Sequence, residues 1–345
     1  MEVDSASVRE HIVMSLNQSQ SKHFVLVGEA LGMLVPSKAL AAPEISKTQF
    51  ELTIAGAESN VATYLARLSH KTSYLTRVGG DELGRLVRRY LHSQGVDVSL
   101  VEVDLSRQTG IAVKETSETE TTVRYYRKWS AASRLDETLV PTLLHLQPDF
   151  VHLSGITAAL SSTANSFLHS AVNRLQGVCQ LSFDVNYRPM LWGETPSEEM
   201  LEICNLTNIC FVGLDEAKKI WGVDRPELVR RLVDRPEYLI VKLGPGGSVV
   251  YHRDGIEQVE ALQVQVVEPV GAGDAFAAGF LHGLASNMIP RDCARFGTIL
   301  ASASLLTSAD VGDLPEKSYV DALLRLSKDE WKSTRFENTL RMLEL

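Results

Sequence analysis

The chain has 345 residues, 44% of them hydrophobic and 22% charged, which is enough apolar material for a globular core. Its formal net charge of -9 disfavours a nucleic-acid partner, because binding to a phosphate backbone requires a basic surface. The sequence contains neither an apolar run of ~20 residues for a membrane span nor a CxxC pair, which predicts a protein of the reducing cytoplasm.

Residues 1–22 are predicted to be a polar extension, because they lack the basic head and continuous apolar stretch of a signal peptide. From residue 23 onward, short apolar runs alternate with helical patterns, as in strands buried on both faces of a parallel sheet. The alternation predicts a doubly wound α/β domain over residues 23–330, with ligands bound beyond the carboxyl ends of its strands, and a helical tail over 331–345. The expected strands cover residues 23–28, 72–79, 149–155, 180–186, 208–213 and 238–244.

Two regions interrupt this alternation with strand-like runs that no helix separates. They cover about residues 49–56 and 109–129, and the polar stretch 116–120 predicts a hairpin turn within the second region. We expect these runs to form a small sheet inserted beside the main domain. Such a sheet would serve as a lid, as a surface for a homo-oligomer, or as both.

The stretch "VEPVGAGDAFAAGFLHGL" at residues 267–284 has the pattern of a loop followed by a helix. Apolar residues recur every four positions after Asp274, which predicts a helix that begins at about Ala272. The free N–H groups and the dipole of a helix N-terminus attract anionic oxygen, and glycines let a phosphate approach the backbone. Asp274 could therefore accept a proton from an alcohol that attacks phosphorus, or it could only cap the helix.

Other nucleotide and metal motifs are absent from the sequence. It contains no GxxxxGK[ST] phosphate loop, and "GEALGM" at residues 28–33 does not supply the GxGxxG of a nicotinamide-dependent dehydrogenase. The nine histidines show neither HxxxH nor HExxH spacing, so we assign no metal centre to them. Any nucleotide site must be built in another way.

Several motifs resemble those of the ribokinase-like (PfkB) carbohydrate kinases. "EPVGAGDAFAAGF" is similar to the C-terminal signature of that family, and residues 55–84, which begin "AGAESNVATYLARL", are similar to its N-terminal signature. With "DVNYRPMLW" at 184–192 and "VKLGPGGS" at 241–248, the resemblance runs in the family's order over residues 23–325. Within the family, "GAESN" and "YYRKWSAAS" look most like the 2-keto-3-deoxygluconate kinases.

The resemblance implies a ribokinase-like, mainly parallel sheet flanked by helices, with a small β-sheet lid. It further implies ATP-dependent phosphorylation of the 6-hydroxyl of 2-keto-3-deoxygluconate in sugar-acid catabolism, with Mg²⁺ bridging the charge on ATP. Two alternatives stay open. One is a kinase for fructose or another keto-sugar acid, and the other is a catalytically weak sensor of sugar acids.

The resemblance also implies roles for individual residues. Asp274 would be the general base, and the amides of Gly271, Ala272 and Gly273 would form an anion hole for the transferred phosphoryl group. A sugar acid needs a cationic partner for its carboxylate, which Arg127 and Arg188 would supply. The implied sugar site comprises Gly56, Ala57, Glu58, Ser59, Asn60, Tyr125, Tyr126, Arg127, Arg188 and Asp310, with Asp313 as a rival of Asp310. The implied ATP site comprises Asn186, Arg188, Lys242, Leu243, Gly244, Pro245, Gly246, Gly247 and the three residues of the anion hole.

The chain departs from the family's pattern at three places. Ala55 replaces the first glycine of the usual pair, and we expect it to crowd the hinge to the lid. Where the family often has N-x-x-E, this chain has "GLDE", so that only Glu216 is left as an indirect ligand of Mg²⁺. Residues 268–270 are Glu-Pro-Val rather than the usual D-T-T, which weakens the inference of a bound monovalent cation.

Overall fold

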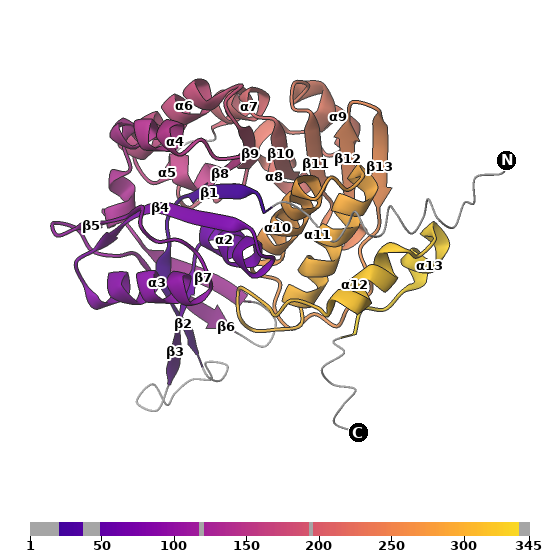
Figure 1. The fold of residues 1–345 in the computed structure, drawn as a ribbon, viewed down its shortest axis with the longest axis horizontal. Helices are drawn as coiled ribbons and strands as arrows, with labels where there is room; N and C mark the ends of the chain where they lie inside the picture. The colour runs from indigo at the N-terminus through magenta and orange to yellow at the C-terminus, as the bar shows by residue number, and fades with distance from the viewer. Residues whose placement is uncertain (1–20, 37–48, 117–120, 193–195, 338–345) are drawn as a thin grey trace.

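The computed structural model describes residues 21–36, 49–116, 121–192 and 196–337, which form one large sheet and one small sheet (Figure 1). The strands of the large sheet lie in the order β13-β12-β11-β10-β9-β8-β1-β4-β5. Its members are β1 (His23–Val27), β4 (Lys71–Gly79), β5 (Val101–Asp104), β8 (Phe150–Ser154), β9 (Gln180–Asp184), β10 (Ile209–Gly213), β11 (Tyr238–Lys242), β12 (Ser248–His252) and β13 (Gly255–Val259).

The six predicted strands of the main domain are confirmed, and they pair in parallel from β11 through β4. Three strands toward the two ends of the sheet were not predicted. These are β5, which extends the parallel order, and the hairpin of β12 and β13, which is antiparallel. Strands β5 and β13 lie at the edges and are largely exposed, so they lack the continuous apolar runs that mark the central strands, whereas β12 is buried between β11 and β13.

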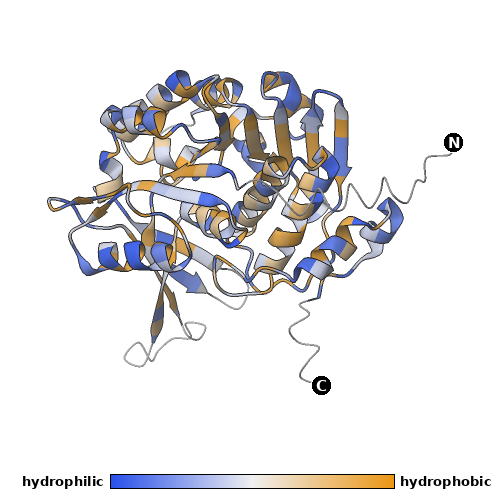
Figure 2. Cartoon of the chain, in the orientation of Figure 1, coloured by the Kyte–Doolittle hydropathy of each residue, from blue (hydrophilic) through white to orange (hydrophobic). Residues whose placement is uncertain are grey.

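Helices cover both faces of the large sheet, because the side chains of each central strand alternate between two apolar cores. In β1, Phe24 and Leu26 belong to one core, whereas Val25 and Val27 belong to the other. Figure 2 shows these strands as predominantly hydrophobic, with hydrophilic residues toward the outside of the surrounding helices. The first core is covered by α2 (Ala57–Arg67), α3 (Glu82–Ser93), α10 (Ala272–Ala285), α11 (Pro290–Ser304), α12 (Lys317–Leu324) and α13 (Lys328–Ser333). The second is covered by α4 (Val140–Leu146), α6 (Ser162–Leu175), α7 (Ser197–Leu206), α8 (Leu214–Trp221) and α9 (Pro226–Leu232), and the remaining short helix is α5 (Gly155–Ala159).

The small sheet projects from the body of the molecule, and its strands lie in the order β3-β2-β6-β7 (Figure 1). The predicted strands β3 (Phe50–Ala55), β6 (Ile111–Thr116) and β7 (Thr121–Tyr126) are confirmed, and β2 (Leu31–Pro36) joins them as a strand that was not predicted. Strand β2 pairs antiparallel with β3 and parallel with β6, so it occupies a central position. We call this four-stranded sheet the lid.

Three predicted segments lie wholly or largely outside the described residues. They are the polar extension, the hairpin turn between β6 and β7, and the end of the helical tail. The described part of the tail contains the end of α13, a helix that begins before the predicted boundary. Among the helices that the structure describes, none combines the length and the apolar character needed to cross a membrane.

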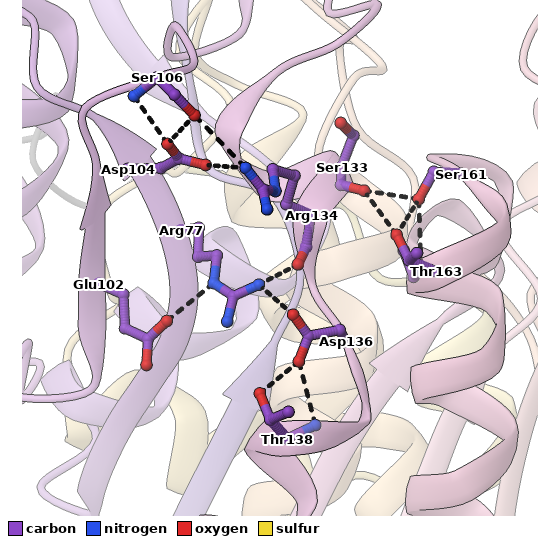
Figure 3. A network of polar contacts seen from close by, with 11 residues as sticks. Arg77, Glu102, Asp104, Ser106, Ser133, Arg134, Asp136, Thr138, Ser161 and Thr163 are labelled. Atoms are coloured by element: carbon purple, nitrogen blue, oxygen red, sulfur yellow. Dashed lines mark hydrogen bonds and ion pairs between the residues drawn. The ribbon is translucent and has the colours of Figure 1, made fainter.

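Polar contacts hold the segment that follows the last lid strand against the large sheet (Figure 3). Arg77 on β4 lies between Glu102 on β5 and Asp136, which follows β7 and the 3-10 turn η2 (Ala131–Arg134). Its Nε is 2.7 Å from a Glu102 oxygen and its Nη1 is 2.6 Å from a carboxylate oxygen of Asp136. Nη1 also donates to the backbone carbonyl of Arg134. The guanidinium therefore joins the edge of the large sheet to the segment that supports the lid.

Helix α10 begins as predicted, and Gly271 is its N-cap residue. The φ of Gly271 is 86°, in the left-handed region that favours glycine, and a Cβ atom there would overlap the carbonyl oxygen of Asp310. Two residues later the surroundings are open, because a Cβ on Gly273 would have the Lys242 ammonium as its nearest neighbour at 3.7 Å. Position 271 therefore requires glycine, whereas position 273 has room for a methyl group.

We predict that Gly271→Ala destabilises the protein and that Gly273→Ala does not. The first substitution combines left-handed strain with a backbone overlap, which should lower the free energy of unfolding by roughly 1–3 kcal/mol. The second places alanine inside a helix, where alanine is favoured over glycine. Urea denaturation of the two variants measures the difference, and equal stability would contradict this account of Gly271.

Candidate active site

The candidate site lies where the carboxyl ends of β9, β10 and β11 meet the N-terminus of α10. Lys242 ends β11, and its Nζ is 2.9 Å and 2.8 Å from the two carboxylate oxygens of Asp184, which ends β9. Burial alone would lower the pKa of Lys242, but the carboxylates of Asp184 and Glu216 raise it above its ordinary value. Lys242 therefore carries a positive charge beside Gly273.

Asp274, in the first turn of α10, is held by a residue from the other predicted signature. The side-chain amide of Asn60 on α2 donates to Asp274 Oδ2 at 2.8 Å. Burial raises the pKa of Asp274 to about 7; the Asn60 hydrogen bond and the charges of Arg188 and Lys242 act in the opposite direction, while Asp184 raises it further. A carboxyl group with this pKa exchanges a proton readily near neutral pH.

Glu216 connects β10 to the segment that follows β9. One of its oxygens accepts the N–H of Gly213 at 2.6 Å and the other accepts the N–H of Tyr187 at 2.9 Å. Burial raises the pKa of this carboxyl group. Next to Tyr187, Arg188 keeps 45% of its side chain exposed, with Nη1 4.0 Å from Glu216. Arg188 thus presents a solvent-accessible cation at the same edge of the sheet.

The predicted phosphate loop forms the turn between β11 and β12. Gly244, Pro245 and Gly246 are exposed, and the N–H of Leu243 donates to the carbonyl of Gly247 at 2.8 Å. Asn186 is buried with a φ of 38°, and its backbone N–H donates to Asp184 Oδ1 at 3.3 Å. The structure thus brings Lys242 and the start of this loop against Gly273, while the contacts of the loop and of Asn186 with a nucleotide stay predictions.

A second group of charges lies between the lid and the end of β1. Arg127, which follows β7, forms an ion pair with Glu29, and its guanidinium lies 5.2 Å from the centre of the Tyr125 ring. Arg127 is only 8% exposed. Tyr126 points to the opposite face of the strand and is 59% exposed, beside a cavity of about 560 Å³ lined by residues 106–111 and 126–130. Closure of these tyrosines over a sugar stays a prediction.

The structure corrects the expectation for Glu58. This residue is fully buried, and one of its oxygens accepts hydrogen bonds from Ser154 at 2.6 Å and Thr157 at 3.0 Å. Its carboxyl group lies where a Cβ atom on Gly28 would be, and burial raises its pKa. Glu58 therefore packs α2 against β1 and β8 and has no surface available to a sugar in this conformation.

The other predicted sugar residues occupy different environments. Ala57 begins α2 and is half-buried, while Ser59 is buried and donates to the carbonyl of Gly56 at 2.9 Å. Asp310 is buried and lies 2.7 Å from Lys114, whereas its rival Asp313 is exposed. The expectation that Asp310 reaches a sugar hydroxyl stays a prediction, because its carboxylate is already engaged by a lysine of the lid.

Three residues of these clusters were not assigned a role from the sequence. They are Glu29, Asp184 and Lys114. Glu29 and Asp184 both stand at the carboxyl end of an apolar strand, which is the signal that would have identified them. Lys114 gives no comparable signal, because a lysine in an alternating strand normally faces solvent.

The comparisons with known proteins identify the family of the chain. The model for "pfkB family carbohydrate kinase" matches residues 21–317. The 2-dehydro-3-deoxygluconokinase of Bacillus subtilis (strain 168) is 31% identical over 310 residues, covering 87% of this chain and 94% of that protein. The 2-dehydro-3-deoxygluconokinase of Thermoproteus tenax is 34% identical over 287 residues, covering 80% and 86%.

Among solved structures, the 2-dehydro-3-deoxygluconokinase of Thermotoga maritima superposes with a TM-score of 0.78 at 22% identity, covering 88% of this chain and 99% of that chain. This similarity confirms the predicted fold class, a mostly parallel sheet flanked by helices with a separate small sheet. The resemblance of the two signatures is likewise confirmed by the match of the family model over most of the chain. The chain belongs to the pfkB family of carbohydrate kinases.

Proposed function

We propose that this carbohydrate kinase transfers a phosphoryl group from ATP to the 6-hydroxyl of 2-keto-3-deoxygluconate, with Asp274 as the general base. The observation that carries the chemistry is the Asp274 carboxyl group, which has a pKa of about 7 and is held by Asn60 at the N-terminus of α10. The choice of substrate is supported by the two relatives of 31% and 34% identity, both of them 2-dehydro-3-deoxygluconokinases.

In this proposal, Asp274 accepts the proton of the attacking hydroxyl group. A base is most effective when its pKa lies near the working pH, because it is then largely deprotonated and still binds a proton well. Asn60 donates to one oxygen, Oδ2, which leaves Oδ1 to face the substrate and fixes the plane of the carboxylate. The hydrogen bond also favours the charged form that is needed for catalysis.

The N–H groups at the start of α10 stabilise the charge of the transferred group. The first amides of a helix have no partner within the helix, and the helix dipole adds to their attraction for anionic oxygen. The ammonium of Lys242, next to Gly273, adds a full positive charge on the same side. Together these groups are suited to a phosphoryl group in transfer.

The carboxylates at the site fit an indirect role in holding Mg²⁺. Among the described residues, no three His, Cys, Asp or Glu side chains form a group that could hold a metal ion by themselves. Mg²⁺ in phosphoryl-transfer enzymes commonly keeps several waters and binds phosphate oxygens, so a single carboxylate nearby is sufficient. Glu216 and Asp184 are the candidates to hold the ion through its waters, and Mg²⁺ would supply positive charge to the phosphates of ATP.

Recognition of the acid group is assigned to Arg188 and Arg127. Arg188 is accessible and lies 4.0 Å from a single carboxylate, so it can bind a carboxylate or a phosphate without losing a strong partner. Arg127 is already neutralised by Glu29 and can contact a substrate only by sharing its guanidinium between two anions. Arg188 is therefore the main candidate for the substrate's charge, and Arg127 with Tyr125 closes the site from the lid.

The experiment that tests this function is ADP release with Mg-ATP across a panel of sugars. The panel contains 2-keto-3-deoxygluconate, its galactose epimer, gluconate, fructose and ribose. We expect preference for the keto-deoxy acids and a fall in kcat of roughly 10²–10⁴-fold in Asp274→Asn. The matched control is Asp254→Asn, which changes an exposed aspartate in the turn between β12 and β13. Turnover on fructose or ribose alone would contradict the proposed substrate, and full activity of Asp274→Asn would contradict the proposed base.

The pH dependence of kcat/KM should reflect the pKa of Asp274. Because the base acts when deprotonated, kcat/KM should fall as the pH drops through about 7, the pKa of Asp274. Asn60→Ala removes a hydrogen bond to the charged form, so its profile should move to higher pH. A profile of Asn60→Ala that coincides with that of the wild type, or lies at lower pH, would be inconsistent with this assignment.

The two arginines should differ when each is replaced by methionine. Arg188→Met should raise the KM for the keto-deoxy acid by about 10-fold or more with little change in thermal stability, because Arg188 is exposed and loosely paired. Arg127→Met should also lower the unfolding temperature, because it leaves the buried Glu29 without its cation. Thermal melts and KM values for both variants provide the comparison, and an unchanged KM in Arg188→Met would remove this residue from the substrate site.

A further inference from the structure

A buried ion cluster joins the lid to the loops around the N-terminus of α10. Lys114 on lid strand β6 is 1% exposed, and its Nζ lies 2.7 Å from Asp310 Oδ1 and 3.7 Å from Glu268 Oε2. It also donates to the carbonyl oxygen of Ser308 at 3.2 Å. The Asp310 and Ser308 oxygens are within hydrogen-bond distance of the ammonium group, whereas Glu268 acts on it only as a second negative charge.

Both acidic residues of the cluster also contact the segment that contains Gly271, Glu268 through its carboxylate and Asp310 through its backbone. Glu268 accepts the backbone N–H of Val270, the residue before Gly271, at 3.2 Å. Asp310 contacts Gly271 directly, because its backbone carbonyl oxygen fills the space where a side chain on Gly271 would lie. Lys114 therefore holds, from the lid, the two segments between which Gly271 is placed.

A gain in stability does not by itself explain this buried cluster of charges. Removing an ammonium and two carboxylates from water costs free energy that a buried ion pair often only balances, and apolar residues of similar volume can be equally stable. An ion pair does, however, fix the relative position of the segments that it joins, because the buried charges lose their partners when the segments move apart. This geometric constraint, rather than a gain in stability, is what we expect Lys114 to contribute.

We propose that Lys114 is a positioning residue that aligns the Gly271–Gly273 amides and Asp274 when the lid is packed against the kinase domain. The inference rests on the proposed phosphoryl transfer at Asp274. Lys114 touches none of the reacting groups in this account. It acts through Glu268 and Asp310, so that the anion hole is correctly formed only while β6 is in place.

The test starts from Lys114→Met, which keeps the length of the side chain and removes its charge. The variant leaves the carboxylates of Glu268 and Asp310 buried beside a carbonyl oxygen with no cation, a site that ammonium or another small cation can fill. Assays use tetramethylammonium chloride as the inert salt, and ammonium chloride replaces it at constant ionic strength. Lys114→Arg keeps the charge, and Lys22→Met is the matched control because Lys22 pairs with Asp149 at the surface.

We expect kcat to fall by about 10²-fold in Lys114→Met, as for a misplacement of catalytic groups by ~1 Å, while the KM for the sugar changes little. Added ammonium should restore kcat in a saturable manner and should raise the unfolding temperature of this variant alone. Lys114→Arg should retain more activity than Lys114→Met. Glu268→Gln, which keeps the pair of Lys114 and Asp310, provides a second variant with a smaller fall in kcat if Lys114→Met does not fold.

Three results would overturn the proposal. The first is loss of stability in Lys114→Met with an unchanged kcat per folded molecule, which would leave only a structural role. The second is a raised KM with an unchanged kcat, which would make Lys114 a substrate contact. The third is an ammonium effect on Lys114→Met that is equal to the effect on Lys22→Met.

If the wild type turned over none of the panel sugars, the proposed function would fail by itself. The rise in the unfolding temperature of Lys114→Met on addition of ammonium would still test whether Lys114 joins the lid to Glu268 and Asp310. The absence of this rise would overturn that link.

Discussion

The site depends on one hydrogen bond, from Asn60 to Asp274, between residues that are separated by 214 positions in the chain. For this bond to form, α2 and α10 must pack side by side against the same face of the sheet, and their first turns must reach the same edge. The apolar residues of both helices belong to one core, which fixes their relative position. The geometry of the candidate site is thus a consequence of how two helices pack, and no single loop determines it.

A balance of charges at this edge gives an acidic protein a locally cationic surface. The net charge of the chain is -9, yet Lys242 and Arg188 converge beside the N-terminus of α10. Their charges are offset by Asp184 and Glu216, which lie beneath them and are nearly buried. The carboxylates raise the pKa of Lys242 and keep it protonated, while burial raises the pKa of Asp274. The acids needed for this arrangement are therefore inside the site, and the remaining negative charge is distributed over the rest of the chain.

The sequence was sufficient for features that depend on local pattern. Continuous apolar runs identified the central strands, and the GAGD stretch identified the start of α10. Features that depend on tertiary pairing were not accessible. Strand β2 follows directly after β1, and only its pairing with β3 and β6 makes it part of the lid. Glu58 was placed at the sugar site because its neighbours are there, yet the helical rotation directs it to Ser154 and Thr157 in the core.

The lid is assembled from strands that come from separate parts of the chain, and this has a consequence for how the protein is made. During synthesis the hairpin of β2 and β3 emerges early, but the partner of its free edge, β6, follows only after α2, β4 and α3. Until then, the edge of β2 exposes unpaired backbone groups, which is the kind of edge that invites pairing with another chain. The nascent protein must therefore keep one sheet edge open until β6 has been made, and the lid is complete before the N-terminus of α10, against which it packs, has been synthesised.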